Sequence, residues 1–216
     1  MTVGLLDILG PEAPKWRQKM RRRRFGRDEV VFHEGDAGDT LHVIEKGRVL
    51  VEVTTARGDV AALSVRGPGE VIGELAVVGD GRRTARVTTL EPTETMSLSP
   101  DILAELRAED PRVDRFLLEL LAEKLQESMA QLMEVLFIPV DKRVLRVVER
   151  LADAFDDRSA RTVVVRVRQE DIASMAGTRR QTANRPLKAA EAEGAIAIRR
   201  GRVEVLDRDL LARLAR

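Results

Sequence analysis

The stretch that decides the fold runs from Gly73 to Val87 and reads GELAVVGDGRRTARV. It combines a glycine-led turn, a carboxylate and, nine residues after that carboxylate, an Arg-Thr-Ala triplet. Glu74 can accept hydrogen bonds from a ribose hydroxyl, and Arg83 can offer a planar fork of N–H donors to a phosphate, with the Thr84 hydroxyl beside it. These groups suit a small anionic ligand that carries a sugar. The residues alone leave a second interpretation open, in which this is an ordinary glycine-rich turn with solvated charges.

The sequence around this stretch, from Phe25 to about Ser99, alternates with a period of two and is punctuated by glycines. Val49, Val51 and Val53, for example, fall on one face of an extended strand. Short strands separated by glycine turns predict an antiparallel β-sandwich or a barrel-like roll. We expect the anion-binding stretch to lie within this roll.

A helical pattern replaces the alternation after Pro111. Apolar residues recur at spacings of three and four, which predicts a coiled-coil seam and therefore a homodimer. The seam consists of Leu118, Leu121, Leu125, Ser128, Leu132 and Val135. Ser128 either sets the packing register or presents a hydroxyl to a molecule beside the seam. Pro139 interrupts the helix, and a second amphipathic helix follows from about Lys142 to Phe155.

The last quarter of the chain predicts a strand, two short helices and a hairpin. The strand covers Thr162 to Val167, and the helical pair covers Gln169 to Arg185 with its turn at Gly177. The hairpin turns at Arg200-Gly201 and resembles a wing. The second helix would start near Thr178 and carry polar and basic side chains suited to groove and phosphate contact: Arg179, Arg180, Gln181, Asn184 and Arg185. The alternative is a helical hairpin with a charged outer face.

The distribution of charge favours the DNA-binding interpretation. The net charge of +1 hides a surplus of six positive charges from Ala160 onward and a surplus of five negative charges before it. A basic end on an acidic body is expected where only that end meets nucleic acid. The run from Arg21 to Arg24 is interpreted differently, as the solvated face of an N-terminal helix.

Composition excludes several classes of site. The chain has no cysteine, which excludes disulfides, thiolate metal sites and iron–sulfur clusters. Only His33 and His42 could supply imidazole, and we interpret both as packed or solvated side chains, so no metal site is expected. We find no apolar run of about 18 residues and no secretory leader, and we therefore expect a cytoplasmic protein without a membrane span.

The order of these parts resembles the Crp–Fnr family of transcription regulators, in the branch of the cAMP receptor (catabolite activator) proteins. The resemblance rests on Gly-Glu-Leu at 73–75 followed by Arg-Thr-Ala at 83–85, and on R-x-T-x-x-R from Arg180 to Arg185. It implies an α+β fold with a β-roll that binds a cyclic nucleotide, a long dimerisation helix and a C-terminal winged helix-turn-helix. We expect these parts at residues 1–110, 111–138 and 139–216.

The resemblance also implies roles for individual residues. The expected ligand-binding residues are Gly73, Glu74, Leu75, Arg83, Thr84 and Ser128, and the expected DNA-binding residues are Arg179, Arg180, Gln181, Thr182 and Arg185. Gly73 and Glu74 would meet the ribose, Arg83 and Thr84 the cyclic phosphate, and Ser128 the adenine. Arg180, Gln181 and Arg185 would occupy the base-reading positions.

Two residues depart from the pattern of the resembled family. Gln181 stands where these relatives usually place Glu, so an amide replaces a carboxylate that could accept from cytosine N4. Pro186 lies inside the expected recognition helix and deletes one backbone hydrogen bond. Both departures predict a half-site related to TGTGA but altered or relaxed at the base pair that Gln181 faces.

The expected function is that of a homodimeric transcription regulator controlled by cAMP or, alternatively, cGMP, which acts as an allosteric ligand rather than a cofactor. Its expected partners are double-stranded DNA with a near-palindromic site and RNA polymerase. One alternative is a regulator that binds DNA without nucleotide, and another is a cyclic-nucleotide-binding protein that acts through protein partners. An enzyme is not expected, because no nucleophile–base pair, metal cluster or nucleotide-triphosphate loop is found, and no catalytic residue is predicted.

Overall fold

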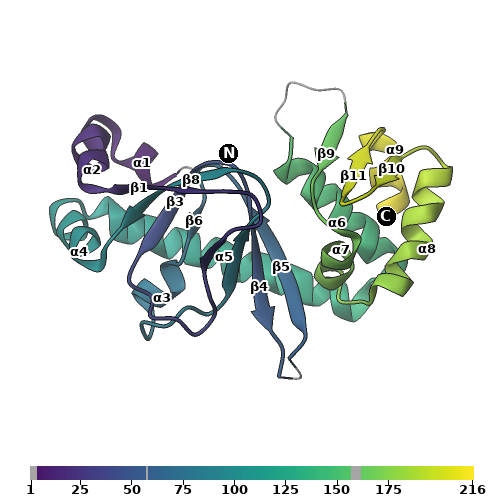
Figure 1. The fold of residues 1–216 in the computed structure, drawn as a ribbon, viewed down its shortest axis with the longest axis horizontal. Coiled ribbons are helices and arrows are strands. Elements are labelled where there is room, and N and C mark those ends of the chain that lie inside the picture. Colours follow the sequence, from purple (N-terminus) through teal and green to yellow (C-terminus); the bar gives the residue numbers. More distant parts are fainter. Residues whose placement is uncertain (1–3, 57, 157–161) are drawn as a thin grey trace. The chain divides into compact units, whose positions relative to one another are not determined.

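The computed structural model describes residues 4–56, 58–156 and 162–216 (Figure 1). The chain divides into two compact units, one formed by Met1–Val60 and Val65–Gln126 and the other by Ala61–Ser64 and Glu127–Arg216. The boundary between them falls inside the long helix α5 (Arg112–Phe137).

Apart from Ala61–Ser64 of β5, which belong to the second unit, the first unit is built around two four-stranded antiparallel sheets, with strand orders β1-β8-β3-β6 and β2-β7-β4-β5. The strands are β1 (Arg21–Phe25), β2 (Val30–Phe32), β3 (Leu41–Lys46), β4 (Val49–Thr54), β5 (Val60–Arg66), β6 (Val71–Ile72), β7 (Arg86–Thr89) and β8 (Thr93–Leu98). This is the predicted antiparallel roll. The short helix α3 (Glu74–Val78) directly follows β6, so the signature stretch begins where a strand ends.

Apolar side chains on the inner faces of these strands form the core of the roll. Ile44, Val49, Ile72 and Val87 make one buried cluster, against which Phe32 packs. A second and larger cluster joins the sheet to the helices α1 (Leu5–Ile8), α2 (Ala13–Lys19) and α4 (Pro100–Glu109) and to the first turns of α5. A single turn, η1 (Gly10–Glu12), connects α1 to α2. The start of α5 is therefore anchored to the roll by hydrophobic burial.

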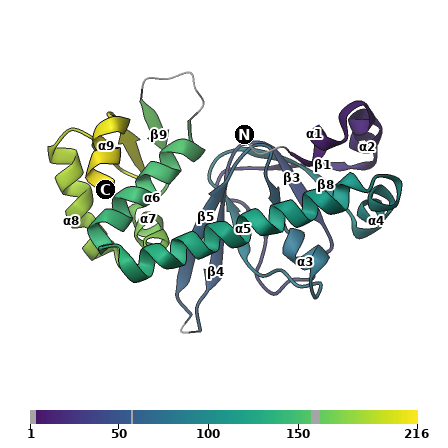
Figure 2. The ribbon, with the colours of Figure 1, turned by 180° about the vertical axis from the view of Figure 1, so that it is seen from behind.

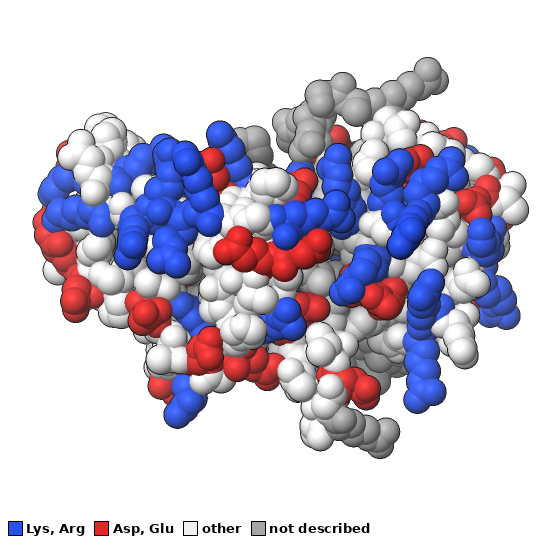
Figure 3. Space-filling model, in the orientation of Figure 1, with Lys and Arg blue, Asp and Glu red and all other residues white. Residues whose placement is uncertain are grey.

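The prediction of an N-terminal helix over Arg21–Arg24 was wrong, because these residues form strand β1. Arg21 pairs with Ser97 and Arg24 with Glu94, which places β1 at the edge of its sheet. Backbone pairing with β8 outweighs the weak helix preference of an arginine run. All four side chains are exposed, as the interpretation of a solvated face requires, and basic side chains gather over this N-terminal part in Figure 3.

The helix α5 runs without a break from Arg112 to Phe137 and can be followed along its length in Figure 2. Its first turns bury Val113, Phe116, Leu117 and Leu120. The predicted seam lies on another face and is largely exposed in the single chain, with Leu118, Leu125, Leu132 and Val135 all more than two-fifths accessible. The helix ends before Pro139, as predicted, because proline there caps the next helix instead of continuing this one.

The second unit has the predicted order of a helix, a strand, a helical pair and a hairpin. Its elements are α6 (Val140–Ala154), β9 (Val163–Val165), α7 (Gln169–Met175), α8 (Arg180–Ala192), β10 (Ile196–Arg199), β11 (Arg202–Val205) and α9 (Arg208–Ala215). The strands form a sheet of order β10-β11-β9, and Arg199 pairs with Arg202 across the wing turn. The helix α9 was not anticipated from the sequence, and it packs against α6.

The turn between α7 and α8 is fixed by glycine and by Arg143. Gly177 has φ +62°, the left-handed conformation that L side chains rarely adopt. Arg143 donates from Nε to the Ala176 carbonyl oxygen at 3.0 Å and from Nη1 to the Ile138 carbonyl oxygen at 2.9 Å. One guanidinium therefore ties this turn to the end of α5. The helix α8 starts at Arg180 rather than near Thr178.

Candidate ligand and DNA-binding sites

Arg83 is the centre of the predicted anion site, and its side chain is only 2% exposed. Nη1 donates to the carbonyl oxygens of Thr40 at 2.7 Å and Gly73 at 3.2 Å, and Nη2 donates to Thr40 Oγ1 at 2.9 Å. The guanidinium carbon lies 4.1 Å from the centre of the Phe32 ring, within the range of a cation–π contact. The fold thus holds this cation against an aromatic face and two carbonyl oxygens.

The bonds of Arg83 leave one edge of the guanidinium available. A guanidinium has five N–H donors, and the three bonds above use both hydrogens of Nη1 and one of Nη2. Nε is buried and has no hydrogen-bond partner among the described residues. Nε–H and the second Nη2–H lie on the same edge, so together they form a two-pronged fork. A buried donor without a partner is costly, and an anionic ligand with two oxygens would satisfy this edge.

Gly73 is required by the approach of Arg83. Its φ is +81°, and a Cβ added there would lie 2.3 Å from Arg83 Nη1 and 3.0 Å from the Thr40 carbonyl oxygen. Any other residue would be strained and would displace the guanidinium. The glycine of the signature therefore makes room for its arginine.

Glu74 is buried beside this site and is paired with a lysine that the sequence analysis missed. Lys124 Nζ on α5 donates to Glu74 Oε1 at 2.7 Å and to the Val71 carbonyl oxygen at 3.1 Å. The Glu74 side chain is 3% exposed. A carboxylate can accept several hydrogen bonds, so Glu74 can accept from a sugar hydroxyl while it keeps the lysine.

Burial has the largest effect on the pKa of Arg83. Desolvation lowers the pKa of Arg83, and the carboxylates of Asp39, Asp36 and Glu74 oppose this shift. Asp39 Oδ1 lies 3.6 Å from Arg83 Nη2, but its side chain is 82% exposed and is screened by water. The Arg83 site therefore offers a positive charge that its neighbours only partly neutralise.

The remaining predicted ligand residues are placed differently. Leu75 and Thr84 are exposed next to the buried Glu74 and Arg83. Ser128 is exposed on α5, one helical turn after Lys124, within the second unit. The structure therefore brings Gly73, Glu74 and Arg83 into one cluster with Thr40, Phe32 and Lys124.

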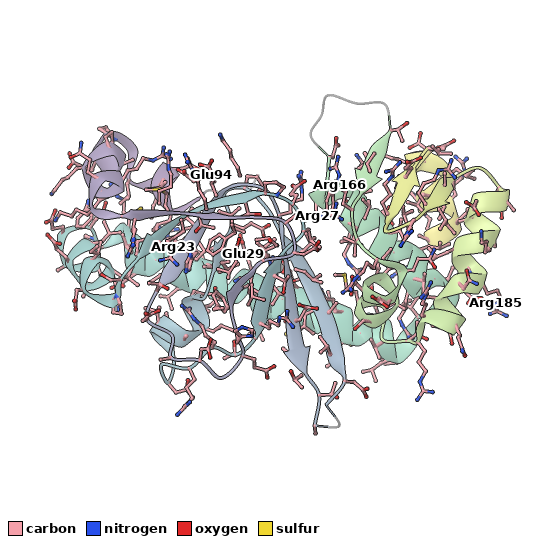
Figure 4. The ribbon with its side chains drawn as sticks, in the orientation of Figure 1. Arg23, Arg27, Glu29, Glu94, Arg166 and Arg185 are labelled. Carbon is pink, nitrogen blue, oxygen red and sulfur yellow. The ribbon has the colours of Figure 1, made fainter. Side chains whose placement is uncertain are left out.

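The predicted DNA-binding residues share the exposed face of α8 and its N-cap. Arg179, Arg180, Gln181, Thr182 and Arg185 are all exposed, while Ala183, Pro186, Leu187 and Ala190 are buried against the unit. Figure 3 shows basic side chains over this second unit, and Arg185 points away from α8 in Figure 4. The helix continues through Pro186, so the proline does not end the face that carries these side chains.

Arg185 pairs with a carboxylate of its own unit. Its Nη2 donates to Asp141 Oδ2 at 2.5 Å, and this carboxylate lies in the first turn of α6. The side chain of Arg185 is 77% exposed and that of Asp141 39% exposed. The hydrogen bond raises the pKa of Arg185. The contact uses one of five donors and leaves the rest of the guanidinium accessible.

Three residues of the Arg83 site were not predicted from the sequence, although one of them could have been. Thr40 and Phe32 lie far from Arg83 along the chain and meet it only because the strands fold together. Lys124 could have been found, because it precedes Ser128 by four residues and so lies on the same face of the helix.

Comparison with known families assigns both ends of the chain. A cyclic nucleotide-binding domain matches residues 22–110, and a Crp-like helix-turn-helix domain matches residues 142–214. A CRP-like cAMP-activated global transcriptional regulator from Mycobacterium tuberculosis is 32% identical over 194 residues, which cover 89% of this chain and 87% of that protein. The chain belongs to the CRP family of transcription regulators.

Two Thermus thermophilus proteins extend this comparison. A cyclic AMP receptor protein is 30% identical and covers 90% of the chain and 88% of its own length. The crystal structure of a transcriptional regulator of the CRP family superposes with a TM-score of 0.75 at 26% identity, covering 89% of this chain and 96% of the other. The predicted family and α+β fold are thereby confirmed, and this CRP-family chain is a DNA-binding transcription regulator with a cyclic-nucleotide-binding domain. The family consists of transcription regulators rather than enzymes. No described helix is long and apolar enough to cross a membrane.

Proposed function

We propose that this CRP-family regulator is a homodimer whose DNA binding is controlled by cAMP. The observation that carries the choice of ligand is the open edge of Arg83, with its buried and unpartnered Nε. A cyclic phosphodiester carries one negative charge and two non-bridging oxygens, which match a two-pronged guanidinium fork. A cyclic 3′,5′-nucleotide also keeps one free ribose hydroxyl, which can donate a hydrogen bond to the Glu74 carboxylate.

Control of DNA binding requires that the ligand binds one conformation more tightly than another. Lys124 supports such a link, because it joins the Glu74 carboxylate to α5. A ribose hydroxyl that engages Glu74 would share this carboxylate with Lys124, and Ser128, one turn further along α5, is proposed to meet the purine. At the other end of this helix, Arg143 joins Ile138 to the turn that precedes α8.

The dimer is proposed to form along the exposed seam of α5. Leu125 is 62% and Leu132 58% exposed in the single chain, and exposed apolar stripes of this spacing are buried in coiled coils. Leu125→Glu would place two like charges at the interface. Sedimentation at micromolar concentration should then show monomers, whereas an unchanged dimer would exclude this seam.

Two copies of α8 are proposed to enter successive major grooves about 34 Å apart on a near-palindromic site. Arg180 and Arg185 can each fork onto guanine O6 and N7, and the Gln181 amide fits adenine N6 and N7 better than it fits cytosine. Selection from a random DNA pool should therefore yield half-sites related to TGTGA but relaxed at the base pair facing Gln181. Gln181→Glu should sharpen selection there toward C·G.

Calorimetry with cAMP and cGMP, followed by DNA binding with and without each nucleotide, tests the proposal. We expect one cAMP per chain, tighter than cGMP, and DNA affinity that rises when cAMP is added. DNA binding that is specific but indifferent to both nucleotides would favour the ligand-independent alternative. Nucleotide binding without any DNA binding would favour a regulator that acts through protein partners. RNA polymerase is the further partner that we propose for the DNA-bound dimer.

A further inference from the structure

Thr40 supplies two of the three hydrogen-bond acceptors that hold the Arg83 guanidinium. Nη1 donates to the backbone oxygen of Thr40 and Nη2 to its side-chain Oγ1. These two bonds occupy the Nη1–Nη2 edge, which shares Nη2 with the open fork. The direction of the fork therefore depends on where Thr40 places its hydroxyl.

The hydroxyl of Thr40 is in turn linked to a buried histidine. His42 Nε2 lies 3.1 Å from Thr40 Oγ1, and His42 Nδ1 lies 3.0 Å from Thr95 Oγ1 on strand β8. A chain of hydrogen bonds thus runs from Arg83 through Thr40 and His42 to Thr95. It crosses from the ligand site into the sheet that contains β3 and β8.

Packing fixes the histidine in place. His42 is 6% exposed. Its ring centre lies 6.5 Å from that of Phe25 and 6.2 Å from that of Phe32. Phe32 is also the ring against which Arg83 stacks. The imidazole therefore supports both the hydroxyl and the aromatic face that Arg83 contacts.

The chemistry of imidazole suits this link. Burial, followed by the positive charges of Arg83 and Arg23, lowers the pKa of His42 to about 4, with Asp39 acting in the opposite direction. The ring is therefore neutral near pH 7, with one donor and one acceptor nitrogen. Because a threonine hydroxyl can donate or accept, either tautomer connects Thr40 to Thr95.

We propose that His42 is a positioning residue of the nucleotide site, which fixes the Thr40 rotamer and thereby aims the open edge of Arg83 at the ligand phosphate. The inference rests on the proposed function and adds a residue to it. Without the imidazole, Thr40 can rotate its methyl group toward Nη2, and the fork loses its orientation. The other nearby acceptor for the Thr40 hydroxyl is the exposed Asp39, whose Oδ1 lies 3.2 Å away.

The test is a double-mutant cycle on cAMP affinity, measured by calorimetry well below each variant's melting temperature. His42→Leu should weaken binding by about 2- to 12-fold, the value of one neutral hydrogen bond. Thr40→Val should weaken it by a similar factor. In the Thr40→Val background, His42→Leu should cause little further loss, because its effect passes through the missing hydroxyl.

Two further variants separate positioning from general packing. His42→Gln retains a donor and an acceptor and should recover part of the affinity that His42→Leu loses. His33→Leu removes an exposed histidine of the same unit and should leave affinity unchanged. A merely structural role for His42 would lower the melting temperature without producing the coupling to Thr40 or the rescue by glutamine.

The outcomes distinguish failure of the positioning role of His42 from failure of the proposed function. If the wild type binds cAMP and His42→Leu binds it equally well, the positioning role is wrong and the proposed function stands. Losses from Thr40→Val and His42→Leu that add in full also overturn it. A wild-type chain that binds neither cAMP nor cGMP overturns the proposed function, and this inference falls with it.

Discussion

Arg83 and Arg185 are both expected to meet nucleotide oxygens or bases, yet their surroundings are opposite. The Arg83 side chain is 2% exposed and is held by Thr40, Gly73 and Phe32. The Arg185 side chain is 77% exposed, with one contact to Asp141. The first is preorganised, so little side-chain entropy is lost on binding. The second is largely solvated, and we expect DNA binding to order it.

The largest expected effect is the loss of the buried arginine. Arg83→Leu removes one partner from a buried ionic contact with the phosphate, which costs roughly 3–5 kcal/mol. Affinity for cAMP, measured by calorimetry, should fall by at least two orders of magnitude. Arg82→Leu is the matched control, because Arg82 is adjacent but exposed and its side chain donates to the Gly35 carbonyl oxygen. Near-normal cAMP affinity in Arg83→Leu would refute the assignment of Arg83 to the nucleotide phosphate.

Acid should lower the free energy of unfolding through the buried His42. The pKa of His42 is lowered to about 4 in the folded state, so between pH 6.5 and 4 the unfolded chain binds the proton more readily. The free energy of unfolding should therefore fall as pH falls through this window, by about 3 kcal/mol once both states are protonated. Urea titrations at pH 7 and pH 4 check this. In His42→Leu the free energy of unfolding should differ less between pH 7 and pH 4 than it does in the wild type. An equal difference in the variant would assign the acid sensitivity to other groups.

Loss of the exposed Arg185 should change DNA sequence preference and leave cAMP affinity unchanged. Arg185→Ala should weaken binding to the selected DNA site by about 5- to 150-fold and relax one base position, the range for one bidentate base contact. Its cAMP affinity should match the wild type. Lys188→Ala, on the same exposed face of α8, should instead weaken binding to all sequences alike. An Arg185→Ala variant with unaltered base preference would refute the reading role.

The smallest effect is expected from the carboxylate beside Arg185. Exposed ion pairs are weak, so Asp141→Asn should release Arg185 at little cost and remove a negative charge close to the DNA. We expect DNA affinity, measured by fluorescence anisotropy, to rise by less than about fivefold. Glu193→Gln is the charge-matched control at the C-cap of α8. A fall of more than tenfold in Asp141→Asn alone would mean that the carboxylate holds Arg185 in its reading position.

The same contrast explains what the sequence could and could not predict. Period-two alternation identified the roll, the i, i+3 and i, i+4 spacing identified α5, and the turn at Gly177 identified the helical pair, because these patterns are local. Gly73 and Arg83 were recognisable because both lie in one short stretch. Thr40, Phe32 and His42 were not, since only the pairing of strands distant in sequence brings them to Arg83.

Local propensity also failed where tertiary contacts dominate. The run from Arg21 to Arg24 reads as helix but forms an edge strand, because β8 supplies backbone partners. The exposed face of α8 was predicted residue by residue, since an amphipathic helix separates its polar side from its buried side. The ion pair between Asp141 and Arg185 was not, because it joins two helices whose packing the sequence does not reveal.

The most direct measurement is the affinity of wild type and Arg83→Leu for the selected DNA site, by fluorescence anisotropy, with and without saturating cAMP. The account predicts that cAMP increases the DNA affinity of the wild type and has no effect on Arg83→Leu at the same concentration. Both proteins should bind the site with similar, weak affinity when cAMP is absent. Equal DNA affinity of the wild type with and without cAMP, or a full response in Arg83→Leu, would contradict it.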